Sequence, residues 1–229
     1  QGQAKQLYPF DERDKRQLAR RASVPSPKGE VIVEVPEEPE AEGLPQPEVP
    51  SETEELRESL KVQATLTRLG GSLGFKVWIA PGDRRKVAAQ ESVDASVMLD
   101  KLPFNYESAT MGTIEQIDVI WVRGRSIARA FEVEHTTAIY SGLLRMADLL
   151  ALQPNLAIKL HIVAPDDKRE KVLRELRRPV FSLLENGPLY DSCTYLSYSS
   201  LEKLRTLPHL SHMSEGVLDE YDEHATEAV

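Results

Sequence analysis

The stretch that decides the fold lies near the middle of the chain and reads Ile117-Asp-Val-Ile-Trp-Val122, then a turn at Gly124, then Phe131-Glu-Val-Glu-His135. Both segments are rich in β-branched and aromatic residues, which is typical of strands, and the short interval between them favours a hairpin. We therefore predict two adjacent strands, at 114–122 and 127–134.

Three carboxylates belong to this hairpin. Side chains alternate across a strand, so Glu132 and Glu134 share one face and Val133 lies on the other. If the hairpin pairs about Gly124, Asp118 lies near both glutamates. Carboxylates that converge on a half-buried sheet repel one another and are hard to desolvate, and a divalent cation such as Mg²⁺ or Mn²⁺ would resolve that conflict.

A structural alternative stays open for these acids. They could face solvent on the outer side of the hairpin, or pair with Arg125 and Arg129. A helix expected directly after His135 favours the metal interpretation, because its N-terminus would place free N–H groups and positive potential beside the acids, which suits a phosphate.

The remaining elements surround the hairpin in an alternating order. Ser51 and Glu54 form a capping box that predicts a helix over 52–69, closed by Gly70-Gly71. A strand at 75–80 and a long connection over 82–112 follow. After the hairpin we expect further helices and strands, at 137–152 (helix), 156–164 (strand), 165–178 (helix), 193–198 (strand) and 199–204 (helix). The order predicts an α/β fold with a mixed central sheet flanked by helices.

The negative charge of the chain lies in its flanks. The 229 residues include 28 Lys+Arg and 37 Asp+Glu, a formal charge of −9. Residues 55–205 carry a net +2, whereas 1–54 carry −5 and 206–229 carry −6. The overall acidity therefore does not exclude a nucleic-acid partner for the central part.

Composition divides the chain into three regions. Residues 1–50 begin with a basic stub, helical at about 10–22, and continue as a Pro/Glu-rich linker that we expect to be disordered. Residues 51–205 form the α/β domain. Residues 206–229 contain no Lys or Arg and are expected to be an acidic flexible tail.

Several classes of protein are excluded. No apolar run is long enough to cross a membrane. The single cysteine, Cys193, excludes an internal disulfide framework and indicates a reducing compartment such as the cytoplasm. The first residue is Gln and no apolar signal region follows it, so we expect a processed chain or a piece of a larger polypeptide.

The helix, the strand and the hairpin with its Asp…Glu-x-Glu pattern, followed by a helix and a strand, resemble the core of the PD-(D/E)XK nucleases. The resemblance covers about 52–204, and it implies the restriction-endonuclease-like αβββαβ core. It also implies a Mg²⁺- or Mn²⁺-dependent endonuclease that acts on DNA in restriction, defence or repair. Because many nucleases of this fold are dimers, it implies a homodimer as well.

The resemblance assigns roles to single residues. Asp118 matches the metal-bridging aspartate, and Glu132 matches the second metal ligand. Glu134 stands where the family usually has lysine, so it lacks the positive charge that would stabilise the developing negative charge. It could instead ligate a second metal ion or act as a general base. A further acid from the first helix corresponds to Glu55 or Glu58.

Four basic residues are candidates for nucleic-acid contact. Arg145, in the helix after the hairpin, could supply the charge that Glu134 lacks, or could be a solvated side chain. The cluster Arg84-Arg85-Lys86 could grip phosphates or be an ordinary loop cluster. Two other functions stay open for the whole chain. One is a non-catalytic module that keeps the nuclease fold for binding nucleic acid or protein, and the other is a regulatory domain of a larger protein.

Overall fold

The computed structural model describes residues 21–26, 29–34, 52–135, 139–152, 158–184 and 187–225. The chain divides into two units, Gln1–Val49 and Pro50–Val229. In the first unit, β1 (Arg21–Ser26) and β2 (Gly29–Glu34) form an antiparallel hairpin, where the sequence predicted a disordered linker. Residues 10–20, most of the predicted basic helix, lie outside the described residues, as does nearly all of the Pro/Glu-rich stretch after β2.

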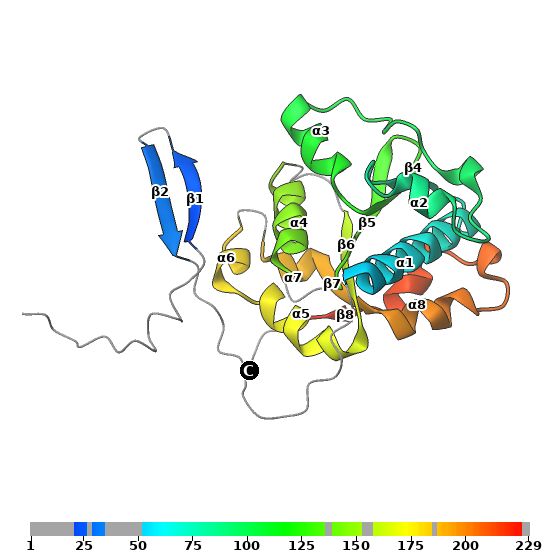
Figure 1. Cartoon of the computed structure of the whole chain (residues 1–229). Coiled ribbons are helices and arrows are strands. Elements are labelled where there is room, and N and C mark those ends of the chain that lie inside the picture. The colour runs from blue at the N-terminus through cyan, green and yellow to red at the C-terminus, as the bar shows by residue number, and fades with distance from the viewer. Residues whose placement is uncertain are drawn as a thin grey trace, which may run out of the picture. The chain divides into compact units, whose positions relative to one another are not determined.

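The second unit is built on a six-stranded sheet in the order β3-β4-β5-β6-β7-β8 (Figure 1). Pairing is antiparallel from β3 to β5, parallel from β5 to β7, and antiparallel between β7 and β8. The strands are β3 (Lys76–Ile79), β4 (Val119–Arg123), β5 (Ser126–Val133), β6 (Lys159–Ala164), β7 (Cys193–Ser197) and β8 (Glu223–His224). The predicted mixed sheet is confirmed, and α1-β3-β4-β5-α4-β6 reproduces the αβββαβ order.

Helices cover both faces of the sheet. On one face, α1 (Glu52–Ser72) and α8 (Tyr198–Arg205) pack over a core that includes Phe75, Trp121 and Phe131. On the other face lie α3 (Ser108–Glu115), α4 (Tyr140–Leu152), α5 (Arg169–Leu176), α6 (Pro179–Ser182) and α7 (Leu189–Ser192). The connection after β3 also contains the short helix α2 (Arg84–Ala88). No described helix is long and apolar enough to cross a membrane.

Two predicted boundaries were wrong, for identifiable reasons. The helix α1 continues through Gly70-Gly71 to Ser72 and ends before Gly74, which adopts the left-handed φ of +83°. Position 70 requires glycine although it lies inside the helix, because a Cβ there would lie 2.6 Å from the indole nitrogen of Trp121. The strand predicted over 114–122 begins only at Val119, since α3 runs through Ile114 and packs it into the core.

The segment after α8 differs from the predicted flexible tail. Residues 206–225 contain two 3₁₀ helices, at Leu210–His212 and Glu215–Glu220, and end with β8 in the sheet. The buried Arg129 holds this segment by donating to Asp219 Oδ1 at 2.9 Å and to the Glu215 carbonyl oxygen at 2.9 Å. Glu215 and Asp219 of this segment are therefore partners of basic residues in the sheet. Residues 226–229 lie outside the described residues.

Candidate active site

The hairpin of β4 and β5 brings Asp118 beside the two glutamates, as the sequence predicted. Val119 pairs with Phe131, so Asp118 lies one residue before β4, next to the end of β5. Its Oδ2 atom accepts a hydrogen bond of 2.8 Å from the backbone N–H of Val133. The contact fixes the aspartate against the strand that bears Glu132.

Glu132 and Glu134 both face α4, and Val133 packs in the core on the opposite face of the sheet. Helix α4 approaches closely because its third residue is Gly142. A Cβ at this position would lie 2.5 Å from Glu134 Oε1 and 3.1 Å from Glu132 Cβ. The Gly142 N–H donates to Glu134 Oε1 at 3.1 Å, so the first turn of α4 holds the second glutamate.

Arg145, one turn further along α4, binds Glu132 through two hydrogen bonds. Its Nε donates to Oε1 at 2.7 Å, and a terminal nitrogen donates to Oε2 at 2.5 Å. The Glu132 side chain is fully buried, and the Arg145 side chain is 27% exposed. This two-point geometry is the strong form of an arginine–carboxylate pair. Arg145 is therefore not a solvated side chain, and its guanidinium reaches the acids from the solvent side.

Burial dominates the acid–base behaviour of all three carboxyls. Desolvation raises the pKa of Asp118 to about 6, of Glu132 to about 8 and of Glu134 to about 7. Repulsion from Asp118 adds to the rise for both glutamates. The positive charge of Arg145 opposes the rise at each carboxyl, and the Glu132 pair raises the pKa of Arg145 itself. Negative charge at this site is thus only partly compensated.

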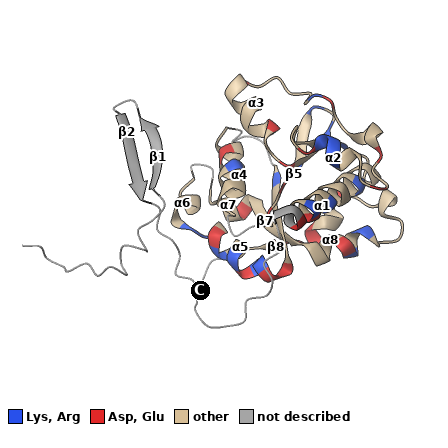
Figure 2. Cartoon of the chain, in the orientation of Figure 1, with Lys and Arg blue, Asp and Glu red and all other residues tan. Residues whose placement is uncertain are grey.

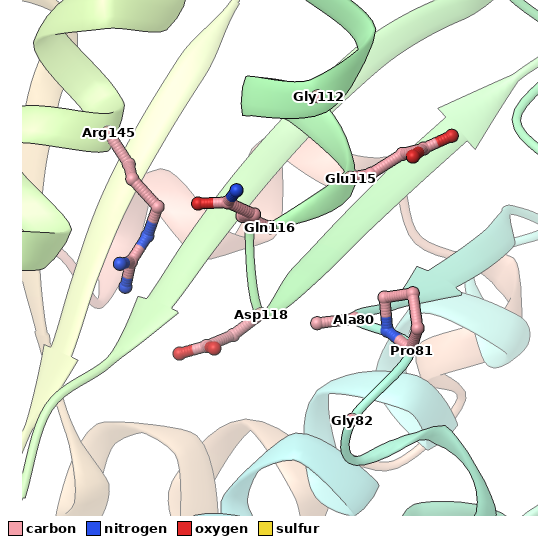
Figure 3. Close-up of a pocket in the computed structure, with 8 residues that line it drawn as sticks. All are labelled: Ala80, Pro81, Gly82, Gly112, Glu115, Gln116, Asp118 and Arg145. Carbon is pink, nitrogen blue, oxygen red and sulfur yellow. The ribbon is translucent and has the colours of Figure 1, made fainter.

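A pocket of about 550 Å³ opens beside these acids and is lined in part by Asp118, Gln116 and Arg145. Figure 3 shows the carboxylate of Asp118, the amide of Gln116 and the guanidinium of Arg145 pointing toward one another. Glu115 lines the same pocket but points away from Asp118. The remaining lining residues are Ala80, Pro81, Gly82 and Gly112.

The described part of the chain contains no group of three or more His, Cys, Asp or Glu side chains arranged to hold a metal ion. Both carboxylate oxygens of Glu132 accept hydrogen bonds from Arg145. The donor set itself suits Mg²⁺, which prefers a few carboxylate oxygens completed by water and phosphate. Asp118 uses Oδ2 for its bond to β5, and its carboxylate borders the pocket.

The basic cluster lies on α2, which Figure 2 shows in blue, and it follows the pocket residue Gly82 in sequence. Arg84 binds Asp100 and the carbonyl oxygen of Leu99, and Lys86 pairs with Asp83 at 3.4 Å. Arg85 is exposed. Two of the three predicted phosphate contacts are thus engaged within the protein, and the cluster lies outside the acid group around Asp118.

Of the two acids proposed from the first helix, Glu58 is exposed and pairs with Lys61 at 3.6 Å, whereas the side chain of Glu55 lies outside the described residues. Burial, followed by the negative charge of Glu58 and then of Glu134, raises the pKa of Tyr198. The Tyr198 hydroxyl lies 2.6 Å from His135 Nε2. His135 is a half-buried, partnered histidine.

Sequence reasoning missed three residues of this site. Gly142 had a usable signal, because a glycine inside a helical pattern often has a packing reason. Gln116 and Tyr198 had none, since one precedes the strand by three residues and the other comes from α8, distant in sequence. Cys193 is buried and free.

Comparison with known proteins connects this geometry to a family. The family model described as the type II restriction enzyme NmeDI C-terminal domain matches residues 36–229. The chain belongs to this family. The type II restriction enzyme NmeDI of Neisseria meningitidis serogroup C is 34% identical over 159 residues, which are 66% of this chain and 43% of that protein. The chain therefore spans less than half the length of this relative. No solved structure matches it significantly.

Proposed function

We propose that the chain is the catalytic region of a DNA endonuclease of the restriction type, and that Asp118, Glu132 and Glu134 form its active site. The observation that supports this most directly is the convergence of two buried glutamates, the half-buried Asp118 and Arg145 beside one pocket, within a fold of the αβββαβ order. The kinship to NmeDI, whose name describes a type II restriction enzyme, supports DNA as the substrate. The same combination supports membership of the PD-(D/E)XK superfamily.

A divalent cation, Mg²⁺ or Mn²⁺, would be held by Asp118 and Glu132, and would supply a water of lowered pKa and neutralise charge on the phosphate. Glu134 is placed to accept the proton of an attacking water, because burial keeps its pKa near 7. Gly142 orients Glu134 for that role through its N–H. Arg145 supplies the positive charge that a lysine at position 134 would have given.

DNA would reach the site over the pocket mouth. Gln116 is exposed there and can donate to a phosphate or a base, and Arg85 on α2 is an exposed charge in the same part of the sequence as Gly82. We propose Arg84 and Lys86 as weaker contacts, because each already has an acidic partner. A homodimer and a place within a longer polypeptide belong to the same proposal.

The test is plasmid and phage DNA cleavage with Mg²⁺, with Mn²⁺ and with EDTA. Asp118→Asn removes the charge of the bridging carboxylate, and we expect it to lower the cleavage rate at least about a hundredfold, the scale of a lost charged catalytic group. Glu115→Gln is the matched control, because Glu115 lines the same pocket but points away. Equal cleavage by the wild type and Asp118→Asn would overturn the assignment.

One observation favours the second candidate, a non-catalytic nuclease-fold module that binds nucleic acid or protein. Arg145 engages both oxygens of Glu132, as a structural ion pair would. A module of this kind would bind duplex DNA with equal affinity in EDTA and in Mn²⁺, and would leave it uncut in both. Cleavage that depends on the cation and on Asp118 would exclude it.

A further inference from the structure

The guanidinium of Arg145 lies where the charge of the site is most concentrated. It hydrogen-bonds both oxygens of Glu132 and acts electrostatically on Asp118 and Glu134 as well. A cation that contacts one buried carboxylate and lies near two others supplies part of the positive charge that a divalent metal ion would supply. Arg145 and the metal would therefore compete for Glu132.

Arg145 also borders open space into which its side chain can turn. Its side chain is 27% exposed, and it lines the pocket together with Gln116 and Asp118. The pocket wall is open at Gly82 and Gly112, since a Cβ built at either glycine meets no atom within 4 Å. A phosphate in this pocket would find the guanidinium of Arg145 and the amide of Gln116, both of them donors.

We propose that Arg145 is an internal counter-ion that occupies the cation position in the DNA-free protein and moves to a phosphate oxygen of DNA when the divalent cation binds Glu132. This inference rests on the proposed nuclease function and adds a coupling to it. The cation and the DNA favour each other, because each stabilises the arrangement in which Arg145 has left Glu132. Without DNA, Arg145 keeps the affinity for the metal low.

The coupling has a structural basis in α4. Gly142 and Arg145 lie three residues apart and therefore on one face of the helix. Gly142 fixes the helix against Glu134 through its N–H, so the backbone beneath Arg145 stays in place when its side chain turns. Only the side chain of Arg145 needs to move between Glu132 and the pocket.

The experiment is calorimetric titration of the DNA-free chain with Mn²⁺ at pH 8. We expect Arg145→Gln to bind Mn²⁺ about tenfold more tightly than the wild type or better, because a competing positive charge has been removed. Arg145→Lys keeps the charge but loses the two-point contact, and should lie between them. Arg178→Gln is the matched control, because Arg178 lies over the ring of Tyr140 at the start of α4 and outside the acid group.

A second titration locates the ion. Adding Glu132→Gln to Arg145→Gln should remove the gain in affinity. Equal Mn²⁺ affinity of the wild type, Arg145→Gln and Arg145→Lys would overturn the counter-ion role while leaving a metal site in place. Absence of Mn²⁺ binding in every folded variant, as judged by circular dichroism, would overturn the metal-dependent function together with the inference.

A third measurement tests the other half of the exchange. In Ca²⁺, the affinity of the wild type for a 30-base-pair duplex should rise relative to EDTA, and Arg145→Gln should lose most of that rise. An identical rise in both proteins would show that Arg145 does not couple the two ligands.

Discussion

Replacement of Gly142 by alanine tests the geometry of the site by adding a single methyl group. The added Cβ would lie 2.5 Å from Glu134 Oε1, 3.1 Å from Glu132 Cβ and 3.4 Å from Glu132 Cγ. The carboxylate of Glu134 can swing away, but doing so breaks its hydrogen bond to the N–H of residue 142. Glu132 cannot move in the same way, because its side chain is fully buried and its head group is held by Arg145.

The expected magnitude follows from opposing effects. Alanine in place of glycine inside a helix gains about 1 kcal/mol from helix propensity. Overpacking a buried contact costs about 1–3 kcal/mol, and the lost hydrogen bond costs about 1 kcal/mol. The free energy of unfolding of Gly142→Ala should therefore fall by about 1–3 kcal/mol, the sum of these terms.

Gly112 provides the matched control, because it lies inside α3 and has open space where its Cβ would be. Gly112→Ala should raise the free energy of unfolding by up to about 1 kcal/mol. Urea unfolding, followed by far-ultraviolet circular dichroism, measures both variants. An equal gain in stability for Gly142→Ala and Gly112→Ala would refute the close approach of α4 to the glutamates.

Three further predictions use other parts of the structure. Arg129→Met should lower the free energy of unfolding by about 1.5–3 kcal/mol, because the buried guanidinium loses its hydrogen bond to the half-exposed Asp219. Limited proteolysis should then cut within 206–225, a region that we expect to resist cleavage in the wild type. Gly70→Ala should destabilise by about 1–3 kcal/mol through its contact with the Trp121 indole, in urea unfolding monitored by tryptophan fluorescence. In EDTA, the free energy of unfolding should fall as the pH rises from 4.5, the ordinary pKa of a glutamate, to about 8, the pKa of folded Glu132. In this range folded Glu132 retains a proton that the unfolded chain has released. Glu132→Gln should flatten this slope, and an unchanged slope would contradict the raised pKa.

The fold could be predicted from local patterns wherever the pattern continued through the whole element. The hairpin had two segments rich in β-branched and aromatic residues around a turn, and its pairing placed Asp118 where expected. The start of β4 could not be predicted in the same way, because Ile114 and Ile117 are buried equally well by a helix or by a strand. The end of α1 was predicted wrongly at Gly70 for a related reason. This glycine leaves room for the ring of Trp121, a residue about fifty positions further along the chain.

The tail shows where composition alone fails. A segment with acids and no bases is expected to be solvated only if no basic residues elsewhere in the chain pair with those acids. Here such basic residues lie in the sheet. Asp219 contacts Arg129 at 2.9 Å and Lys159 at 2.5 Å, and Asp222 accepts from Thr194 at 3.0 Å. Partitioning net charge by position along the chain therefore separated residues that fold together.

The glutamate at position 134 is understandable once α4 is considered together with β5. In this chain the positive elements of the site, the N–H of Gly142 and the guanidinium of Arg145, both come from one face of the helix. A lysine at position 134 would have no acceptor for that N–H and would add a second positive charge beside Arg145. Glu134→Lys would thus remove the acceptor of the Gly142 N–H. The carboxylates that the new lysine could stabilise are those that Arg145 already stabilises. Under the proposed assignment to the PD-(D/E)XK nucleases, Glu134 on β5 and Arg145 on α4 together take the place of the lysine of the family pattern.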